Sequence, residues 1–176
     1  SILGSTGSIG VNTLLVADNL PDQFDVQYLT AYSNSEKLIA QAEKHLPQAV
    51  AIIDEEAGKI VRDALDNTIE VLTGRLGLLE IAGRDDVDIV MNGLVGTAGM
   101  EPTLKSIEAG VDVALSNKES LVMAGSIIDS AKKKSGATLF PVDSEHSAIW
   151  QCLAGENMAD VSKIILTGSG GPFRTR

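Results

Sequence analysis

Two acidic side chains near the C-terminal end have the spacing of a metal site. Asp143 and Glu145 stand two positions apart in the segment 141–146, Pro-Val-Asp-Ser-Glu-His. In extended backbone such positions point to the same side, so their carboxylates could converge on Mg²⁺ or Mn²⁺, which favour oxygen ligands. The adjacent His146 could carry a proton or support a ligand. A helix start, where the helix dipole favours acids, explains the same residues equally well.

A glycine-rich segment near the N-terminus has the pattern of a nucleotide-binding turn. Residues 4–10 read Gly-Ser-Thr-Gly-Ser-Ile-Gly, after a short aliphatic stub and before a helix-like segment. Glycines permit a tight turn and let backbone amides approach a pyrophosphate, to which the helix N-terminus adds partial positive charge. The spacing is GxxGxxG rather than GxGxxG, and a tightly packed strand–helix turn is the alternative. In this context the pattern favours dinucleotide binding.

The end of the second predicted strand indicates which nucleotide is used. NAD-binding folds place an acid there to hold the ribose 2′-hydroxyl. This chain has Tyr32, Ser33 and Asn34 instead, and the nearby Glu36 completes a Ser-x-x-Glu capping box that begins at Ser33. A neutral strand end does not repel a 2′-phosphate, so the sequence favours NADP, with Ser33 and Asn34 as natural contacts.

A further polar segment falls where another strand gives way to a helix. Residues 116–120 read Ser-Asn-Lys-Glu-Ser, and ligands bind at this edge in open α/β sheets. A capping box explains Ser116 and Glu119 but leaves Asn117 and Lys118 without a structural role.

Near the end of the chain, residues 167–172 read Thr-Gly-Ser-Gly-Gly-Pro. Backbone amides and hydroxyls of such a loop can hold a phosphate. A plain strand-end loop is the alternative.

Aliphatic runs alternate with helix-like segments along nearly the whole chain. We predict strands at 2–3, 26–31, 49–53, 70–72, 88–92, 112–115, 138–141 and 163–166. We predict helices at 8–19, 35–45, 55–65, near Gly77, and at 100–109, 118–135 and 144–153. The alternation predicts an α/β fold with a doubly wound, mostly parallel, Rossmann-like sheet. We expect residues 1–140 to form it, and residues 141–176 to be the truncated start of a second, α+β domain.

Composition and charge exclude several classes of protein. Apolar residues make up 44% of the 176 residues and aromatic residues 3%, which suits aliphatic parallel strands. The net charge of −10 argues against nucleic acid as a partner. Cys152 is the only cysteine, so no disulfide framework is expected and an intracellular protein is favoured. No apolar run approaches the ~20 residues of a membrane span.

Five segments together resemble the 1-deoxy-D-xylulose 5-phosphate reductoisomerase family. They are residues 4–10, 92–104, 116–122, 141–151 and 166–174, in matching order. The resemblance implies a metal-dependent, NADPH-linked rearrangement and reduction of that phosphosugar to 2-C-methyl-D-erythritol 4-phosphate, in the non-mevalonate isoprenoid route. It also implies a homodimer in the full-length protein, located in the bacterial cytoplasm or in a plastid.

The resemblance implies roles for individual positions. NADPH would contact Thr6, Gly7, Ser8, Ile9, Tyr32, Ser33, Asn34, Asn117 and Glu119. The substrate would contact Lys118, Ser144, Glu145 and Ser169, with Lys118 and Glu145 as catalytic residues, while Asp143 and Glu145 would bind Mg²⁺ or Mn²⁺. The family often has glycine and a basic residue where this chain has Tyr32 and Ser33.

Further parts of the family's active site lie beyond the matching segments, so we expect this chain alone to bind NADPH but to turn over poorly. Two other functions remain open: a metal-independent NADP-linked dehydrogenase, and a nucleotide-binding module without catalysis.

Overall fold

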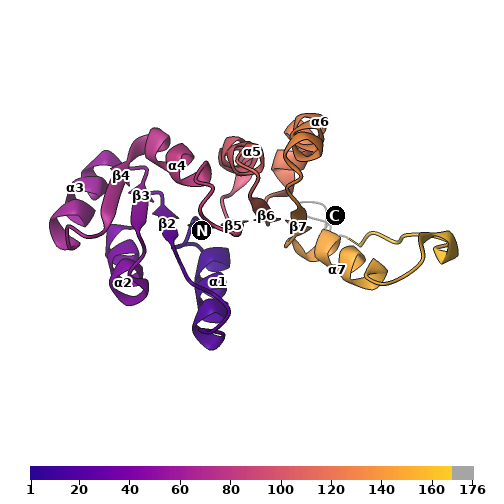
Figure 1. The fold of residues 1–176 in the computed structure, drawn as a ribbon, viewed down its shortest axis with the longest axis horizontal. Helices are drawn as coiled ribbons and strands as arrows, with labels where there is room; N and C mark the ends of the chain where they lie inside the picture. The colour runs from indigo at the N-terminus through magenta and orange to yellow at the C-terminus, as the bar shows by residue number, and fades with distance from the viewer. Residues whose placement is uncertain (168–176) are drawn as a thin grey trace, which may run out of the picture.

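The computed structural model describes residues 1–167, and a seven-stranded parallel sheet forms its centre (Figure 1). The strands are β1 (Ile2–Leu3), β2 (Tyr28–Ala31), β3 (Ala49–Ile52), β4 (Glu70–Thr73), β5 (Ile89–Asn92), β6 (Asp112–Leu115) and β7 (Leu139–Pro141). Their order is β4-β3-β2-β1-β5-β6-β7, and every neighbouring pair is parallel. The chain runs outward from β1 in both directions, so the topological switch point lies between β1 and β5.

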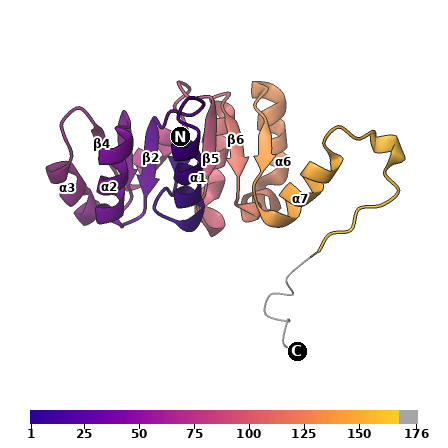
Figure 2. The same cartoon turned by 90° about the horizontal axis from the view of Figure 1, so that it is seen from below.

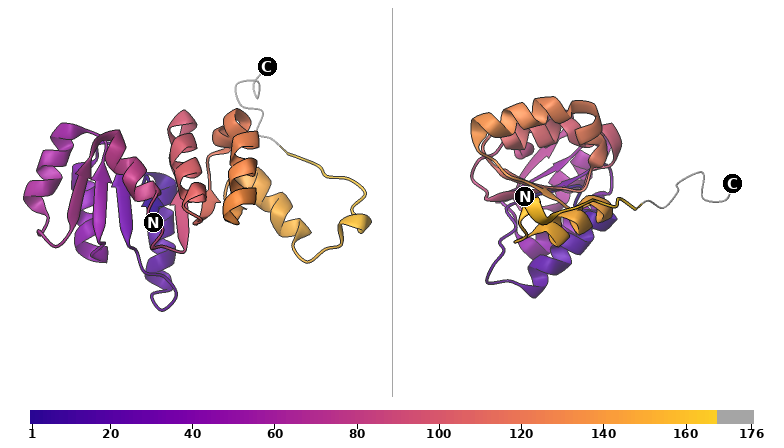
Figure 3. Two further views of the ribbon diagram at one scale, coloured as in Figure 1. Left: turned by 45° about the horizontal axis from the view of Figure 1, so that its top comes forward. Right: turned by 90° about the vertical axis from the view of Figure 1, so that its right-hand side faces the viewer.

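Helices cover both faces of this sheet. They are α1 (Ser8–Asn19), α2 (Ser35–His45), α3 (Glu55–Ala64), α4 (Gly74–Ala82), α5 (Met100–Glu108), α6 (Lys118–Ser135) and α7 (Ser144–Leu153), with 3₁₀ turns η1 (Gly96–Gly99) and η2 (Met158–Asp160). Helices α1 to α3 lie on one face and α4 to α6 on the other (Figure 3), and their core residues form separate clusters against the sheet. Among the helices of residues 1–167, none combines the length and apolarity that crossing a membrane requires.

The buried strands are aliphatic on both sides because both faces are covered. In β3, Val50 and Ile52 join the core under α1 to α3, whereas Ala49 and Ala51 face α4. In β2, Leu29 lies on the first of these faces and Tyr28 on the second. This arrangement confirms the predicted doubly wound α/β fold.

The predicted strand at 163–166 is wrong. Residues 161–167 have no regular structure, and Ile164, Ile165 and Leu166 are exposed. β7 is the last strand of the sheet, and the segment after α7 extends away from it (Figure 2). A strand needs a neighbour for its backbone hydrogen bonds, and the described part of the chain offers none here.

Candidate nucleotide and metal site at the carboxyl edge of the sheet

The glycine-rich turn joins β1 to α1 at the centre of the sheet. Gly4 has a φ of +79°, a conformation that glycine adopts without strain, and its amide donates to the Thr30 side chain at 3.0 Å. A Cβ on Gly10 would lie 2.4 Å from the Gly4 carbonyl oxygen, so only glycine allows α1 to approach this closely. Gly7 is the N-cap of α1 and makes no side-chain cap. No side chain of this residue therefore occupies the first-turn amides of α1. A phosphate site at a helix start needs amides that are free in this way.

Two side chains of α2 form hydrogen bonds with this turn. Gln41 donates from Nε2 to the Ser5 carbonyl at 2.9 Å and accepts from the buried Ser5 hydroxyl at 2.7 Å. Lys37 donates from Nζ to the Thr6 carbonyl at 2.9 Å. Sequence reasoning missed both contacts, because residues more than 30 positions apart give no local signal of pairing.

The end of β2 carries Tyr32, Ser33 and Asn34, and Tyr32 is 73% exposed. Asn34 is the N-cap of α2, and its Oδ1 accepts from the Lys37 amide at 3.0 Å. The capping box predicted from Ser33 to Glu36 is therefore wrong, because Asn34 and not Ser33 caps the helix, which begins at Ser35 as predicted.

The loop after β5 is held by two buried asparagines. Asn92 donates from Nδ2 to the Gly99 carbonyl at 2.9 Å and to the Thr103 hydroxyl at 2.8 Å. Asn117, which is 2% exposed, donates to the Leu94 and Gly96 carbonyls at 2.8 and 2.6 Å. Sequence reasoning did not single out Asn92, although an asparagine at the end of a buried strand is a usable signal.

Asn117 is also the N-cap of α6. Its Oδ1 accepts from the Ser120 amide at 2.9 Å and the Ser120 hydroxyl at 3.0 Å. The predicted capping box from Ser116 to Glu119 is wrong, because the Ser116 hydroxyl donates to the Asn92 carbonyl instead. All four hydrogen-bonding positions of the Asn117 side chain are thus occupied within the protein. Lys118 and Glu119 follow, exposed, at the start of α6.

The acidic pair lies at the start of α7, next to β7. Asp143 is the N-cap residue, with Oδ1 2.6 Å from Nδ1 of His146, whereas its Oδ2 is buried and has no hydrogen-bond partner. Glu145 belongs to the first turn of α7, so the expected extended backbone across the pair is wrong. Glu145 Oε2 lies 3.8 Å from Lys118 Nζ and accepts from the Ser144 hydroxyl at 3.0 Å.

These surroundings keep Glu145 ionised. A hydrogen bond from its own backbone amide holds the pKa of this carboxyl below its usual range, and the Ser144 hydroxyl and the Lys118 charge act in the same direction. An ionised carboxylate beside an unpartnered buried oxygen suits a divalent cation. Within residues 1–167 no group of three or more acidic, histidine or cysteine side chains is gathered, so two carboxylates give only part of a coordination shell.

All these groups meet at one edge because parallel strands share it. The glycine turn follows β1, residues 32–34 follow β2, the asparagine loop follows β5, Lys118 follows β6, and the acidic pair follows β7.

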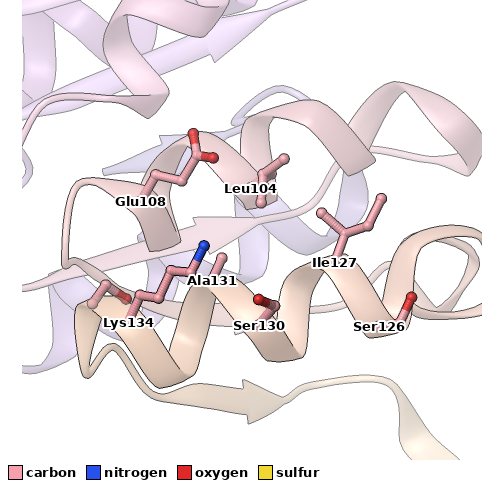
Figure 4. A pocket seen from close by; sticks show the side chains of 8 residues that line it. Leu104, Glu108, Ser126, Ile127, Ser130, Ala131 and Lys134 are labelled. Carbon is pink, nitrogen blue, oxygen red and sulfur yellow. The ribbon is translucent and has the colours of Figure 1, made fainter.

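Of the predicted site residues, Ser169 lies outside the described range. A groove of about 510 Å³ between α5 and α6, lined by Glu108, Ser130 and Lys134 among others (Figure 4), belongs to the outer helical layer instead.

Comparison with known proteins identifies a family over nearly the whole chain. The family model described as 1-deoxy-D-xylulose 5-phosphate reductoisomerase matches residues 1–125, and the model of the C-terminal domain of that enzyme matches residues 139–176. Curated proteins of this name from Chloroherpeton thalassium and Thermoanaerobacter pseudethanolicus are each 50% identical, over 99% and 98% of this chain. The chain spans about half the length of these relatives, 46% and 45%.

Solved structures agree with this result. The Zymomonas mobilis enzyme in complex with NADPH superposes with a TM-score of 0.90 at 41% identity, covering 99% of this chain and 46% of that one. A DOX-P reductoisomerase in complex with magnesium gives 0.88 at 40% identity, covering 98% and 46%. Another, in complex with NADPH, fosmidomycin and magnesium, gives 0.80 at 42% identity, covering 86% and 38%.

Proposed function

Because the chain belongs to the 1-deoxy-D-xylulose 5-phosphate reductoisomerase family, we propose that it forms the nucleotide-binding and metal-binding beginnings of such an enzyme. Residues 1–140 would bind NADPH, and residues 141–176 would start the catalytic domain. The reaction would convert 1-deoxy-D-xylulose 5-phosphate to 2-C-methyl-D-erythritol 4-phosphate. One observation carries the proposal: the unpartnered Asp143 Oδ2 and Glu145 lie on the same sheet edge as the glycine turn.

The cofactor half of the proposal rests on the turn and the neighbouring strand ends. Backbone amides of Ser8 and Ile9 at the start of α1 would hold the pyrophosphate, with Thr6 and Gly7 beside it in the turn, where the Gly7 amide already donates to the Gly4 carbonyl at 3.1 Å. Tyr32, Ser33 and Asn34 would lie at the adenosine end. Asn117, whose side chain is occupied, would shape the site by fixing the loop after β5, and Glu119 beside it would contact the cofactor.

The metal half rests on Asp143 and Glu145, which would hold Mg²⁺ or Mn²⁺ with ligands from beyond residue 167. Such an ion acts as a Lewis acid toward substrate oxygens. His146 fixes the Asp143 carboxylate, and Ser144 and Lys118 orient Glu145. Lys118 also offers positive charge beside any negative charge that develops on the substrate. Ser144 and Ser169 would contact the substrate.

The test uses a protein with the full length of the relatives. We expect NADPH oxidation that requires both the phosphosugar and Mg²⁺ or Mn²⁺, and we expect Asp143→Ala to abolish it while the NADPH Kd stays unchanged. Activity that survives both a chelator and Asp143→Ala would favour a metal-independent dehydrogenase. NADPH binding without any phosphosugar effect would favour a binding module.

The proposal extends to assembly and location. We expect a homodimer of the full-length protein, in the bacterial cytoplasm, since the similar curated proteins are bacterial. Sedimentation of the full-length protein would test the assembly.

A further inference from the structure

Lys37 brings an ammonium group from α2 to the glycine turn. It is the third residue of α2 and is exposed, and its Nζ donates to the Thr6 carbonyl at 2.9 Å. This contact joins the beginning of α2 to the turn between β1 and α1. The ammonium therefore lies in the space between the end of β1 and the end of β2.

The charge of Lys37 is not paired with a carboxylate. Within residues 1–167, no acidic oxygen lies within 4.0 Å of its Nζ, whereas Lys118 and Arg75 at the same edge pair with Glu145 and Glu101. An ammonium has three donors, so the contact with Thr6 leaves two for a ligand. Glu36 is the adjacent residue on the helix, and side chains at i and i+1 do not face each other.

The end of β2 needs such a cation if it receives a 2′-phosphate. In dinucleotide-binding folds the ribose hydroxyls lie at this strand end. Ser33 and Asn34 are neutral, and Asn34 Oδ1 is already occupied by the Lys37 amide, which leaves the Asn34 amide group as a donor. Hydroxyl and amide groups are neutral, so they can donate hydrogen bonds to a phosphate dianion but do not neutralise its charge.

We propose that Lys37 selects NADPH over NADH by pairing with the 2′-phosphate while Ser33 and Asn34 add neutral donors. The proposal rests on the proposed function and names the residue on which its cofactor preference depends. Lys37 is thus a specificity-determining residue that lies outside the strand end itself.

The test measures the Kd of NADPH and of NADH for the whole chain and for Lys37→Gln. We expect the variant to bind NADPH roughly 10- to 100-fold more weakly, as the loss of a charge-assisted contact implies, and to bind NADH within about twofold of the wild type. Lys44→Gln is the matched control, because Lys44 lies two turns further along α2 and pairs with Asp18 at 2.6 Å. It should leave both constants unchanged.

The conservative variant Lys37→Arg separates charge from local shape, and we expect it to keep most of the NADPH preference. A Lys37→Gln protein with an intact preference would overturn the inference. So would equal weakening of both nucleotides, since that result would assign Lys37 only to holding the Thr6 turn. A wild-type chain that binds neither nucleotide would instead contradict the proposed function.

Discussion

One oxygen of Asp143 lies 2.6 Å from Nδ1 of His146, while the other is buried without a hydrogen-bond partner. The imidazole thus holds the carboxylate in one orientation. A cation bound to the other oxygen would supply the partner that this oxygen lacks. Leaving a buried acceptor unpaired is costly, and a bound ion is one of the few arrangements that would compensate for it.

The first prediction concerns this contact. His146→Ala removes the support of Asp143 without removing a proposed ligand, so Mn²⁺ affinity should fall roughly 10- to 100-fold. Asp143→Asn should lower it further. Titration of the full-length protein with Mn²⁺, followed by electron paramagnetic resonance, measures both changes.

Asp160→Asn is the matched control, because this acid lies in the exposed turn η2. Equal Mn²⁺ affinity in wild type and Asp143→Asn would contradict the assignment of the metal site.

The second prediction concerns Asn117. Asn117→Ala leaves two partly buried carbonyls, those of Leu94 and Gly96, without their donor and removes the cap of α6. The free energy of unfolding should fall by about 2–4 kcal/mol. Urea denaturation measures it. Asn157→Ala, which removes the cap of the exposed η2, should cost less than ~1 kcal/mol, and equal losses in the two variants would refute the role of the Asn117 network.

The third prediction contrasts two glycines. A methyl group on Gly10 would collide with backbone atoms of Gly4 and Ser5, so Gly10→Ala should cost about 1–3 kcal/mol of stability and weaken NADPH binding. Gly125 directly follows the kink of α6 at Ala124, and a Cβ there would meet open space, so Gly125→Ala should raise stability by less than about 1 kcal/mol. Thermal denaturation measures the direction of the stability change in each variant. A Gly10→Ala protein as stable as the wild type would show that α1 does not approach the turn this closely.

The fourth prediction concerns pH. Burial lowers the pKa of His45 below its ordinary value, against the opposing charge of Asp18. The folded state therefore favours the neutral imidazole. This contribution to stability is complete above about pH 6.5 and is lost as the pH falls through the folded-state pKa.

Urea midpoints at pH 7.5 and 5.5 should consequently differ, with lower stability at pH 5.5. His45→Gln should reduce that difference. A wild-type midpoint that does not change between these values, or an undiminished difference in His45→Gln, would disprove the assignment.

The sequence predicted the sheet and the edge where the polar groups gather, because buried parallel strands and the residues that follow them leave local signals. Several of the details that failed depend on neighbours distant in the chain. Ser116 does not cap α6 because its hydroxyl donates to the Asn92 carbonyl, 24 positions earlier. Lys37 and Gln41 reach the glycine turn by the same kind of long-range contact, and residues 163–166 lack the neighbour that a strand needs.

The order of the strands also sets the distance that any bound dinucleotide would have to span. β5 and β6 separate β1 from β7, and strands lie about 4.8 Å apart, so the turn after β1 and the acids after β7 are roughly 14 Å apart. A nucleotide whose phosphates rest at β1 must extend over two strand ends in one direction before its nicotinamide approaches the acids. Its adenosine must extend in the other direction, toward β2. Inserting or deleting one central strand would therefore separate the proposed nucleotide site from the proposed metal site even if every side chain of both were kept.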